Sequence, residues 1–269
     1  MDYRIKPGSK AKLSSMDPGD TAGHNQDEAV REKTRHDLDD LAELQELLYA
    51  AQTHAVLVVL QGIDTAGKDG TIEHVFSGVN PQGCRVASFK RPTELELSHD
   101  YLWRVHAHCP AKGEIVIFNR SHYESVLVER VHELVPRSVW KGRYQEINEF
   151  ERLLTRSDTI VVKLFLNLSK GEQKKRLRAR EEDPEKRWKC NPADWEERKL
   201  WDDYQEAFDE MLRKTSTAEA PWWVVPSDRK WFRNMVVADV ITDVLKPYRE
   251  GWIAAVEARG TRALRTGAS

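Results

Sequence analysis

A glycine-rich segment at residues 62–71, GIDTAGKDGT, has the residue types and spacing that most clearly indicate chemistry. Gly62, Gly67 and Lys68 match the template GxxxxGK[ST] of a phosphate-binding loop, and a β-branched run precedes them. Glycines let backbone N–H groups converge on phosphate oxygens, and the dipole of a following helix adds positive potential. An ordinary glycine-rich turn is the alternative. We predict that Lys68 is catalytic and that six other residues bind substrate: Gly62, Ala66, Gly67, Asp69, Gly70 and Thr71.

Two acids in this segment bear on metal binding. The position after Lys68 normally holds a Ser or Thr that binds magnesium, and here it is Asp69. This departure puts the usual magnesium arrangement in question. Asp64 lies inside the loop, where a carboxylate beside phosphates is favourable only with a hard cation between them. We therefore expect Asp64 to be a catalytic metal ligand, with Mg²⁺ as the cofactor and Mn²⁺ as a substitute.

A second polar segment, NRSHYE at 119–124, follows the apolar run EIVIF at 114–118. Ligands of parallel sheets bind at the carboxyl ends of the strands, so this segment should face the same crevice as the glycine-rich loop. Asn119 stands where such enzymes usually have a magnesium-binding Asp, and it offers only a neutral oxygen. Arg120 can grip a phosphate with its guanidinium fork or form a surface ion pair. His122 is a candidate substrate-binding residue or a hydrogen-bonded structural histidine.

A basic run, KKRLRAR at 174–180, follows the fourth predicted strand. From 170 to 189 there are nine Lys or Arg and five Asp or Glu, an excess of four positive charges. A solvated helix face is the alternative for such a run. Its position is that of the closing lid of a phosphate-transferring kinase, which excludes water and brings positive charge onto a polyanion. Trp188 can be either a lid anchor or a stacking face for a base.

Further basic residues follow the second predicted strand. Lys90, Arg91 and Arg104 are equally compatible with phosphate contacts and with surface salt bridges. The segment HAHC at 106–109 contains three residues of metal-ligand type, but no fourth ligand is placed beside them. We therefore expect this segment to pack in the fold rather than to bind a metal.

Alternating apolar runs and helical patterns must position these side chains. Short β-branched and aromatic runs predict about five strands, at 54–61, 85–89, 114–118, 159–166 and 222–225. Spacings of three and four predict helices, at 27–52, 95–108, 121–131, 143–155, 169–182, 191–214 and 230–245. Ser169 should cap its helix, with Glu172 at the capping-box position. Strands separated by helices indicate an α/β fold with a parallel sheet covered on both faces.

The 269 residues contain no internal repeat and no interior linker, so we expect one domain. We place an arm at 1–25, the domain at 26–248 with its lid at about 170–192, and a frayed tail at 249–269. The chain has 42 Lys+Arg and 44 Asp+Glu, which argues against a nucleic-acid coat. It contains no membrane-spanning apolar run and no secretory signal. Three cysteines without a CxxC favour reduced thiols in a cytoplasmic protein.

Five motifs together resemble family-2 polyphosphate kinases. The resemblance covers roughly residues 30–248 and rests on GIDTAGKDG, FKRPTE, YLWRVHAHCP, GEIVIFNRSHYE and the segment from LSKGEQKKRLRAR to DPEKRWK. It implies a three-layer P-loop kinase fold with a helical lid. It also implies magnesium-dependent phosphoryl transfer between inorganic polyphosphate and a purine nucleotide, in a homo-oligomer that is a tetramer built from dimers.

The resemblance assigns residues one by one. Asp64 and Lys68 match the acid and the lysine of the loop, and Arg120 matches the arginine that follows the third strand. Arg180 matches the lid arginine, and Arg178 is its near neighbour. The resemblance therefore implies that Asp64, Lys68, Arg120 and Arg180 are catalytic.

Asn119 stands where many family members have Asp and resembles the subgroup that phosphorylates both nucleoside mono- and diphosphates. Glu124, one helical turn beyond Arg120, is a candidate on the acceptor side. We count Lys90, Arg91, Asn119, His122, Glu124 and Arg178 among the substrate-binding residues.

The hypothesis is direct in-line transfer from polyphosphate to AMP or ADP, with GMP and GDP as further candidate acceptors, and without a phosphohistidine. An ATP-dependent nucleoside-monophosphate kinase is the alternative within the same fold class, although its loop would normally end in GK[ST]. A non-catalytic regulator that binds nucleotide or polyphosphate is the third hypothesis, favoured by Asp69 and Asn119 and opposed by Lys68 and Arg120.

Overall fold

The computed structural model describes residues 3–185, 187–189 and 193–266. Within these residues six strands form one sheet in the order β1-β6-β5-β2-β4-β3. They are β1 (Arg4–Ile5), β2 (Ala55–Gln61), β3 (Cys84–Ser88), β4 (Ile115–Asn119), β5 (Thr159–Asn167) and β6 (Trp222–Pro226). Neighbouring strands are parallel, except that β1 pairs with β6 in the antiparallel sense. The predicted α/β class and the five parallel strands are confirmed, and β1 adds a sixth strand at one edge.

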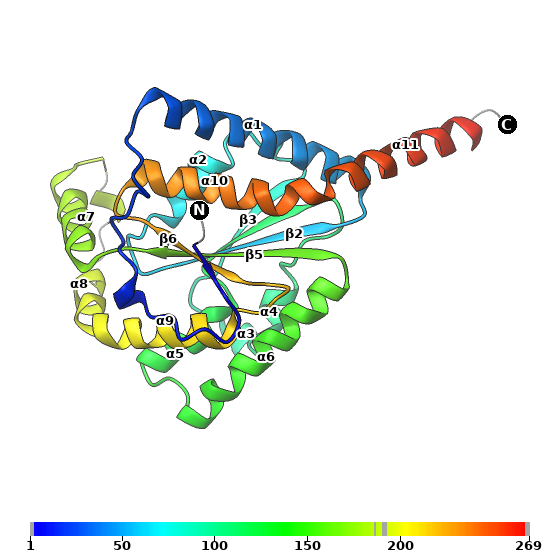
Figure 1. The fold of residues 1–269 in the computed structure, drawn as a ribbon. Coiled ribbons are helices and arrows are strands. Elements are labelled where there is room, and N and C mark those ends of the chain that lie inside the picture. Colours follow the sequence, from blue (N-terminus) through cyan, green and yellow to red (C-terminus); the bar gives the residue numbers. More distant parts are fainter. Residues whose placement is uncertain (1–2, 186, 190–192, 267–269) are drawn as a thin grey trace.

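Helices cover both faces of the sheet, which gives the three predicted layers (Figure 1). One face is covered by α1 (Glu28–Ala51), α2 (Lys68–Val75) and α10 (Lys230–Leu245), and the other by α5 (Val128–Val131), α6 (Arg137–Arg156) and α9 (Trp201–Thr215). Val58 of β2 shares the first core with Leu41 and Val237, and the next residue back, Leu57, shares the second with Ile147. Because β2 is buried on both faces, its whole length is apolar up to Gln61, as parallel central strands require.

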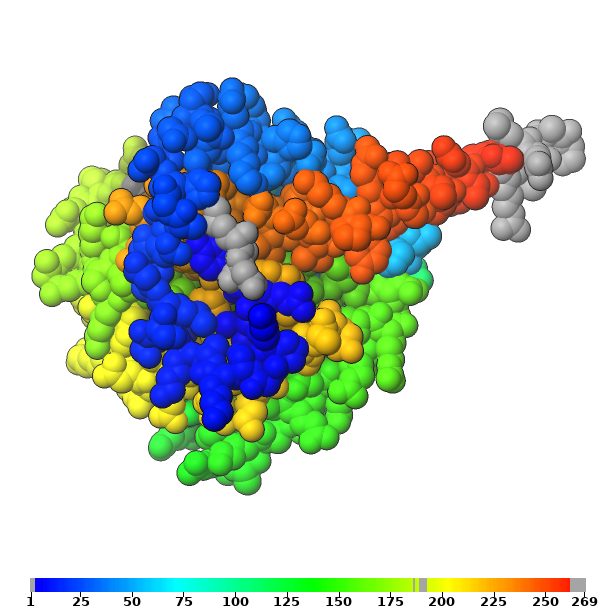
Figure 2. Space-filling model, viewed as in Figure 1, coloured from blue at the N-terminus to red at the C-terminus, as the bar shows by residue number. Residues whose placement is uncertain are grey.

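The two ends of the chain form elements that the sequence pattern did not predict. Arg4 and Ile5 of the arm pair with Trp223 and Trp222 of β6. The tail was expected to fray, and that was wrong, because α11 (Arg249–Thr266) continues from the body and projects past it (Figure 2). Trp252, which is fully buried, anchors α11 to the fold. The domain bounds 26–248 stay a prediction. Within the described ranges, no helix is both long and apolar enough to span a bilayer.

Three predicted helices are shorter or divided. The predicted helix at 95–108 is α3 (Glu94–Leu97) and α4 (Trp103–His106). The one at 121–131 is a 3-10 turn (His122–Val126) followed by α5, and the one at 191–214 contains α8 (Ala193–Glu197) and α9. Side chains that bond to nearby backbone compete with helix formation, as Asp100 and Ser121 do by accepting from Leu102 N and Tyr123 N.

The basic lid segment forms α7 (Lys170–Glu182), and the Ser169 side chain accepts from Glu172 N at its start, as predicted. The predicted lid runs to residue 192, and its residues 186 and 190–192 lie outside the described part of the chain.

Candidate active site

The glycine-rich loop joins β2 to α2 at the carboxyl edge of the sheet. Gly62 and Gly67 have φ angles of 152° and 102°, a region in which a side chain is strained. A Cβ atom at Gly62 would lie 2.8 Å from the carbonyl oxygen of Leu166, and one at Gly67 would collide with the guanidinium of Arg233. Among the described residues, nothing accepts a hydrogen bond from the backbone N–H of Gly67. The loop therefore presents a free N–H beside the start of a helix, which is what an anion site requires.

Lys68 begins α2 and folds its side chain back against the loop. It is 7% exposed, and its Nζ donates to the carbonyl oxygens of Gly62 at 2.8 Å and Ile63 at 3.3 Å. Burial, followed by the positive charge of Arg120, lowers the pKa of Lys68 to about 8. The ammonium is therefore mostly charged at neutral pH, and it lies where a P-loop lysine acts on the transferred phosphoryl group.

Arg120 lies at the carboxyl end of β4, next to the loop, because β4 and β2 are parallel neighbours. Its φ is 61°, a left-handed backbone that is uncommon for a residue with a side chain. The guanidinium donates to the carboxylate of Asp64 and, at 3.3 Å, to that of Glu124. Burial disfavours the charged guanidinium, but the negative charges of Glu124 and Asp64 outweigh burial and raise the pKa of Arg120. Asp64 of the glycine-rich loop thus meets Arg120 and Glu124 of the segment at 119–124 in one cluster.

Asp69 and Asn119, the two residues that depart from the usual magnesium-binding pattern, contact each other. Asn119 Nδ2 donates to Asp69 Oδ1 at 2.6 Å. Asp69 lies in the first turn of α2, where the helix dipole favours a negative charge. Asp64, Asp69 and Asn119 together offer the hard oxygen atoms that Mg²⁺ prefers. In the described part of the chain no three His, Cys, Asp or Glu side chains form a metal cluster.

The predicted lid helix α7 also lies close to Asp64 and Arg120. Arg180 of α7 forms an ion pair with Asp194 of α8 at 3.6 Å, whereas Arg178 is exposed. Burial, followed by the negative charge of Asp64, raises the pKa of Asp194, so the charges of Asp64 on the loop and Asp194 on α8 act on each other. A small pocket beside Asp64 is also lined by Gln173 of α7 and Glu197 of α8. Helix α7 of the predicted lid and helix α8, which follows it, therefore face the predicted catalytic residues.

A cavity of about 820 Å³ opens beside this cluster. Lys90, Arg91 and Glu124 line it, as do Tyr101 and Arg143, whose guanidinium lies 4.5 Å from the centre of the Tyr101 ring. The volume falls within the range of about 300–1,000 Å³ that is usual for small-molecule sites. Cations, an aromatic ring and a carboxylate in one cavity suit a ligand that has both phosphate groups and a base.

Comparison with known proteins places these features in a family. The family described as polyphosphate kinase 2 matches residues 24–250. The chain belongs to the polyphosphate kinase 2 family. It is 53% identical over 249 residues to a Meiothermus ruber protein named AMP/ADP-polyphosphate phosphotransferase, covering 91% of this chain and 92% of the relative. It is 42% identical over 275 residues to the ADP-polyphosphate phosphotransferase of Rhodopseudomonas palustris, covering 98% and 95%.

A solved structure gives the same result. The crystal structure of polyphosphate kinase 2 from Arthrobacter aurescens TC1 superposes with a TM-score of 0.88 at 42% identity, covering 92% of this chain and 88% of the other. The family resemblance of the sequence motifs and the P-loop kinase-like fold are confirmed. The chain is a phosphotransferase of the polyphosphate kinase type.

In this polyphosphate kinase 2 chain, His122 is held by a buried ionic network. Its side chain is fully buried, with Nε2 3.2 Å from Glu151 Oε1 and with no partner for Nδ1 among the described residues. Glu151 also accepts from Tyr123 Oη and Lys163 Nζ, each at 2.6 Å. The network supports the turn that follows Arg120. This geometry favours the structural alternative for His122, although the residue also lies in the wall of the large cavity.

Basic residues after β3 are partly engaged in the fold. Arg104 donates to the carbonyl oxygen of Lys90 at 3.0 Å and lies over the Phe89 ring at 5.3 Å. His106 and His108 pack edge-on against phenylalanine rings. The residues of the HAHC segment thus contribute packing. The exposed side chains of Lys90 and Arg91 remain at the rim of the cavity.

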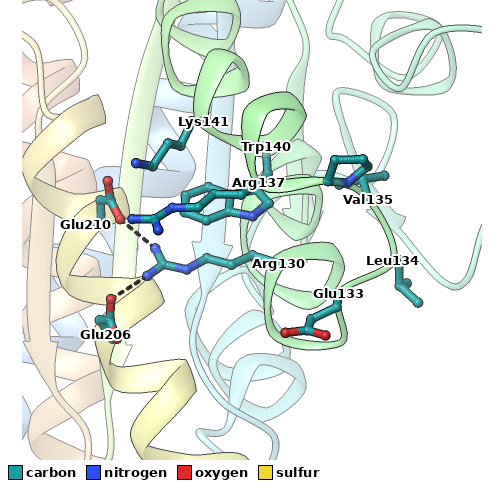
Figure 3. Close-up of a pocket in the computed structure, with 10 residues that line it drawn as sticks. Arg130, Glu133, Leu134, Val135, Arg137, Trp140, Lys141, Glu206 and Glu210 are labelled. Atoms are coloured by element: carbon teal, nitrogen blue, oxygen red, sulfur yellow. Dashed lines mark hydrogen bonds and ion pairs between the residues drawn. The ribbon is translucent and has the colours of Figure 1, made fainter.

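A second pocket of about 650 Å³ adjoins this cavity, and Figure 3 shows the residues that line it. Arg130 of α5 donates to Glu210 at 2.7 Å and Glu206 at 2.8 Å, both on α9, and its guanidinium lies 4.5 Å from the Trp140 ring centre on α6. Residues 134 and 135 line both hollows. Arg130 therefore joins α5 to α6 and α9, and residues of α5 and α6 also line the larger cavity.

Two arginines that the sequence reasoning missed lie against the glycine-rich loop. Arg176 of α7 donates to the carbonyl oxygens of Thr65 and Ala66, both at 3.1 Å. Arg233 of α10 donates to the same Ala66 oxygen at 3.3 Å. Arg176 lies one helical turn before Arg180, on the same face of α7, so helical spacing could have identified it. Arg233 had no such signal, because α10 is buried almost all round.

Proposed function

We propose that this chain transfers the terminal phosphoryl group of inorganic polyphosphate to AMP and ADP, forming ADP and ATP, with GMP and GDP as further acceptors. The observation that carries the proposal is the meeting of Lys68, Asp64 and Arg120 beside a cavity large enough for a nucleotide. The names of the Meiothermus and Rhodopseudomonas relatives give polyphosphate as donor and AMP or ADP as acceptor for those proteins.

The transfer needs positioning more than acid–base chemistry. The attacking oxygen of the acceptor phosphate is already deprotonated at neutral pH, so no strong general base is required. This oxygen bonds to the terminal phosphorus, while the bond from that phosphorus to the bridging oxygen breaks and the shortened chain leaves with the electron pair. Lys68 and Arg120 stabilise the charge on the phosphoryl oxygens, and the loop and cavity align the reactants. No phosphohistidine is formed.

The remaining predicted residues take supporting roles in this proposal. Asp64 would hold Mg²⁺, or Mn²⁺ in its place, and the carbonyl oxygen of Asn119 would be a neutral partner. The ion would supply positive charge to the phosphates when bound. Arg180 would reach the polyphosphate once the lid closes and Asp194 releases it, and closure would exclude competing water. The acceptor phosphates would lie near Lys90 and Arg91 at the cavity rim.

The test is an assay with polyphosphate and Mg²⁺ but without ATP, run separately with AMP, ADP, GMP and GDP. Nucleotides with one more phosphate are the expected products, separated by anion-exchange chromatography. Lys68→Ala should abolish the products while its thermal unfolding remains like that of wild type. Products from ATP and AMP but none from polyphosphate would instead favour the ATP-dependent kinase. Undiminished transfer by the Lys68→Ala variant would contradict the proposed site.

We propose further that the chain works as a homo-oligomer, a tetramer built from dimers, in the cytoplasm. The projecting helix α11 and the exposed Val86 of the edge strand β3, 47% accessible, are surfaces that a second copy could cover. Cys84 and Cys109 are free thiols, which suits a reducing compartment. Light scattering should give the mass of four chains of 31.1 kDa each, and a single-chain mass would contradict this assembly.

A further inference from the structure

Arg233 has a charge that is almost completely buried. The residue is 2% exposed, and its Nε and Nη2 donate to the amide oxygen of Asn234 at 3.1 and 2.8 Å. Among the described residues no carboxylate forms an ion pair with it, and the charge that acts on it is that of another cation, Arg176. Burial, followed by Arg176, lowers the pKa of Arg233 to about 10. The guanidinium is therefore still charged at neutral pH, in surroundings that disfavour the charge.

Arg176 reaches the same loop from the lid helix. Its Nη1 donates to the carbonyl oxygens of Thr65 and Ala66, and its Nη2 donates to those of Ser227 at 2.7 Å and Asp228 at 3.2 Å. Glu172 lies 3.0 Å from its Nε, so this arginine, unlike the other, has a counterion. Guanidinium groups from two helices thus converge on the carbonyl oxygen of Ala66.

The orientation of that carbonyl determines the orientation of an N–H group. The Ala66 carbonyl and the Gly67 N–H belong to one peptide unit, and the described chain has no cis peptide bonds. In a trans peptide the C=O and N–H point in opposite directions, so holding the carbonyl turns the N–H away from both arginines. The contact of Arg233 with Gly67 is so close that any side chain at this position would collide with it.

We propose that Arg176 and Arg233 are positioning residues for the polyphosphate donor, which hold the Ala66–Gly67 peptide with its N–H directed at a phosphate. We also propose that the charge of Arg233, which has no counterion of its own, is balanced by the polyanion in the loop. Both statements rest on the proposed function.

Arg233→Met tests the proposal, because Met has a similar length and no charge. Binding of linear polyphosphate is measured without nucleotide, from the rise in the unfolding temperature, and KM is measured for polyphosphate and for ADP. We expect polyphosphate binding to weaken at least about tenfold, the size of a lost charge-assisted contact, with KM for ADP unchanged. The unfolding temperature of the free variant should be equal to or above that of wild type, since a charge without a counterion is gone.

Arg259→Met is the matched control. Arg259 also donates to two main-chain carbonyls, those of Ala50 at 2.9 Å and Ala51 at 3.3 Å, before β2 begins and away from the loop. Its variant should bind polyphosphate like wild type.

The outcomes distinguish a failure of this inference from a failure of the proposed function. Wild-type affinity for polyphosphate in folded Arg233→Met, or a fall only in the stability of the free protein, would overturn the inference. If that variant does not fold, Arg176→Met carries the same test, with weaker polyphosphate binding expected and wild-type binding refuting it. If polyphosphate does not stabilise even the wild-type protein, the proposed function itself fails.

Discussion

Glu151→Gln should lower the free energy of unfolding by about 3 kcal/mol, because it leaves a buried ammonium group without its counterion. Glu151 and Lys163 lie 2.6 Å apart, with side chains 2% and 0% exposed. Burial raises the pKa of Glu151, but Lys163 and His122 outweigh it and hold the pKa below its usual value. The carboxylate is therefore ionised at neutral pH, and its charge is what the substitution removes.

The structure limits the size of this effect. Breaking one partner of a buried ion pair typically costs about 3–5 kcal/mol. Lys163 Nζ also donates to Thr215 O at 2.6 Å and Tyr123 Oη at 3.0 Å, and these bonds remain in the variant. Burial lowers the pKa of Lys163, so the amine can lose its proton once Glu151 no longer opposes that shift. Both features favour the lower end of the range, which for a chain of this size is a fall in Tm of about 6–12 °C.

Urea unfolding followed by tryptophan fluorescence, together with thermal unfolding, measures the loss. Lys112→Met is the control, because Lys112 and Asp158 form a similarly close pair, 2.7 Å apart, but their side chains are about half exposed. Such surface pairs contribute little to the free energy of unfolding, so the unfolding midpoint of Lys112→Met should equal that of wild type within error. The double variant Glu151→Leu/Lys163→Met removes both charges and should regain much of the stability that Glu151→Gln loses.

Two results would refute this reasoning. One is a Glu151→Gln midpoint equal to that of wild type, which would mean that the pair is not ionised or not buried in solution. The other is a double variant less stable than Glu151→Gln, which would mean that hydrogen bonding, rather than charge, carries the stability.

Two further predictions concern the loop. Because burial places the pKa of Lys68 at about 8, kcat/KM for polyphosphate should fall as the pH rises through that value and the ammonium loses its proton. A pH profile that stays flat to well above 8 would contradict this charge requirement. Asn119→Asp would bring a second carboxylate to within 2.6 Å of Asp69, where like charges repel unless a cation lies between them. Mg²⁺ should therefore raise the Tm of this variant more than that of wild type, and an equal rise would argue against a metal beside these residues.

The parallel strands could be predicted because each is a short apolar run that leads into a loop. Even β5 was recognised, although Lys163 interrupts it, because the apolar residues on either side outweigh one lysine. β1 could not be predicted, since two residues form a strand only by pairing with β6. α11 was not predicted, because the residues after Pro247 lack the regular apolar spacing that indicates a helix. From residue 249 to residue 261, where the burial of α11 is described, most residues are exposed and need no such spacing, and Trp252 alone is fully buried.

Part of the site could be predicted for a related reason. Asp64 lies in the loop after β2, Lys68 begins α2 at the end of that loop, and Arg120 directly follows β4. Because β2 and β4 are parallel neighbours, all three lie at the same edge of the sheet. Arg176 and Arg233 approach the loop from its other side, on helices that begin more than a hundred residues later. No local pattern relates those positions to the loop, and only the packing of α7 and α10 brings them there.

The net charge of −2 conceals an arrangement in which the acids of the site hold its cations in place. Arg120 lies between two carboxylates, and Arg180 is paired with Asp194. A polyanion must compete with these carboxylates or arrive with a metal ion that binds them, so the site is more selective than a uniformly basic groove. Arg233 differs, because no carboxylate in the described part of the chain neutralises it. Its charge lies behind the loop and out of reach from the surface, so it favours phosphates seated in the loop over a polyanion that only lies along the protein.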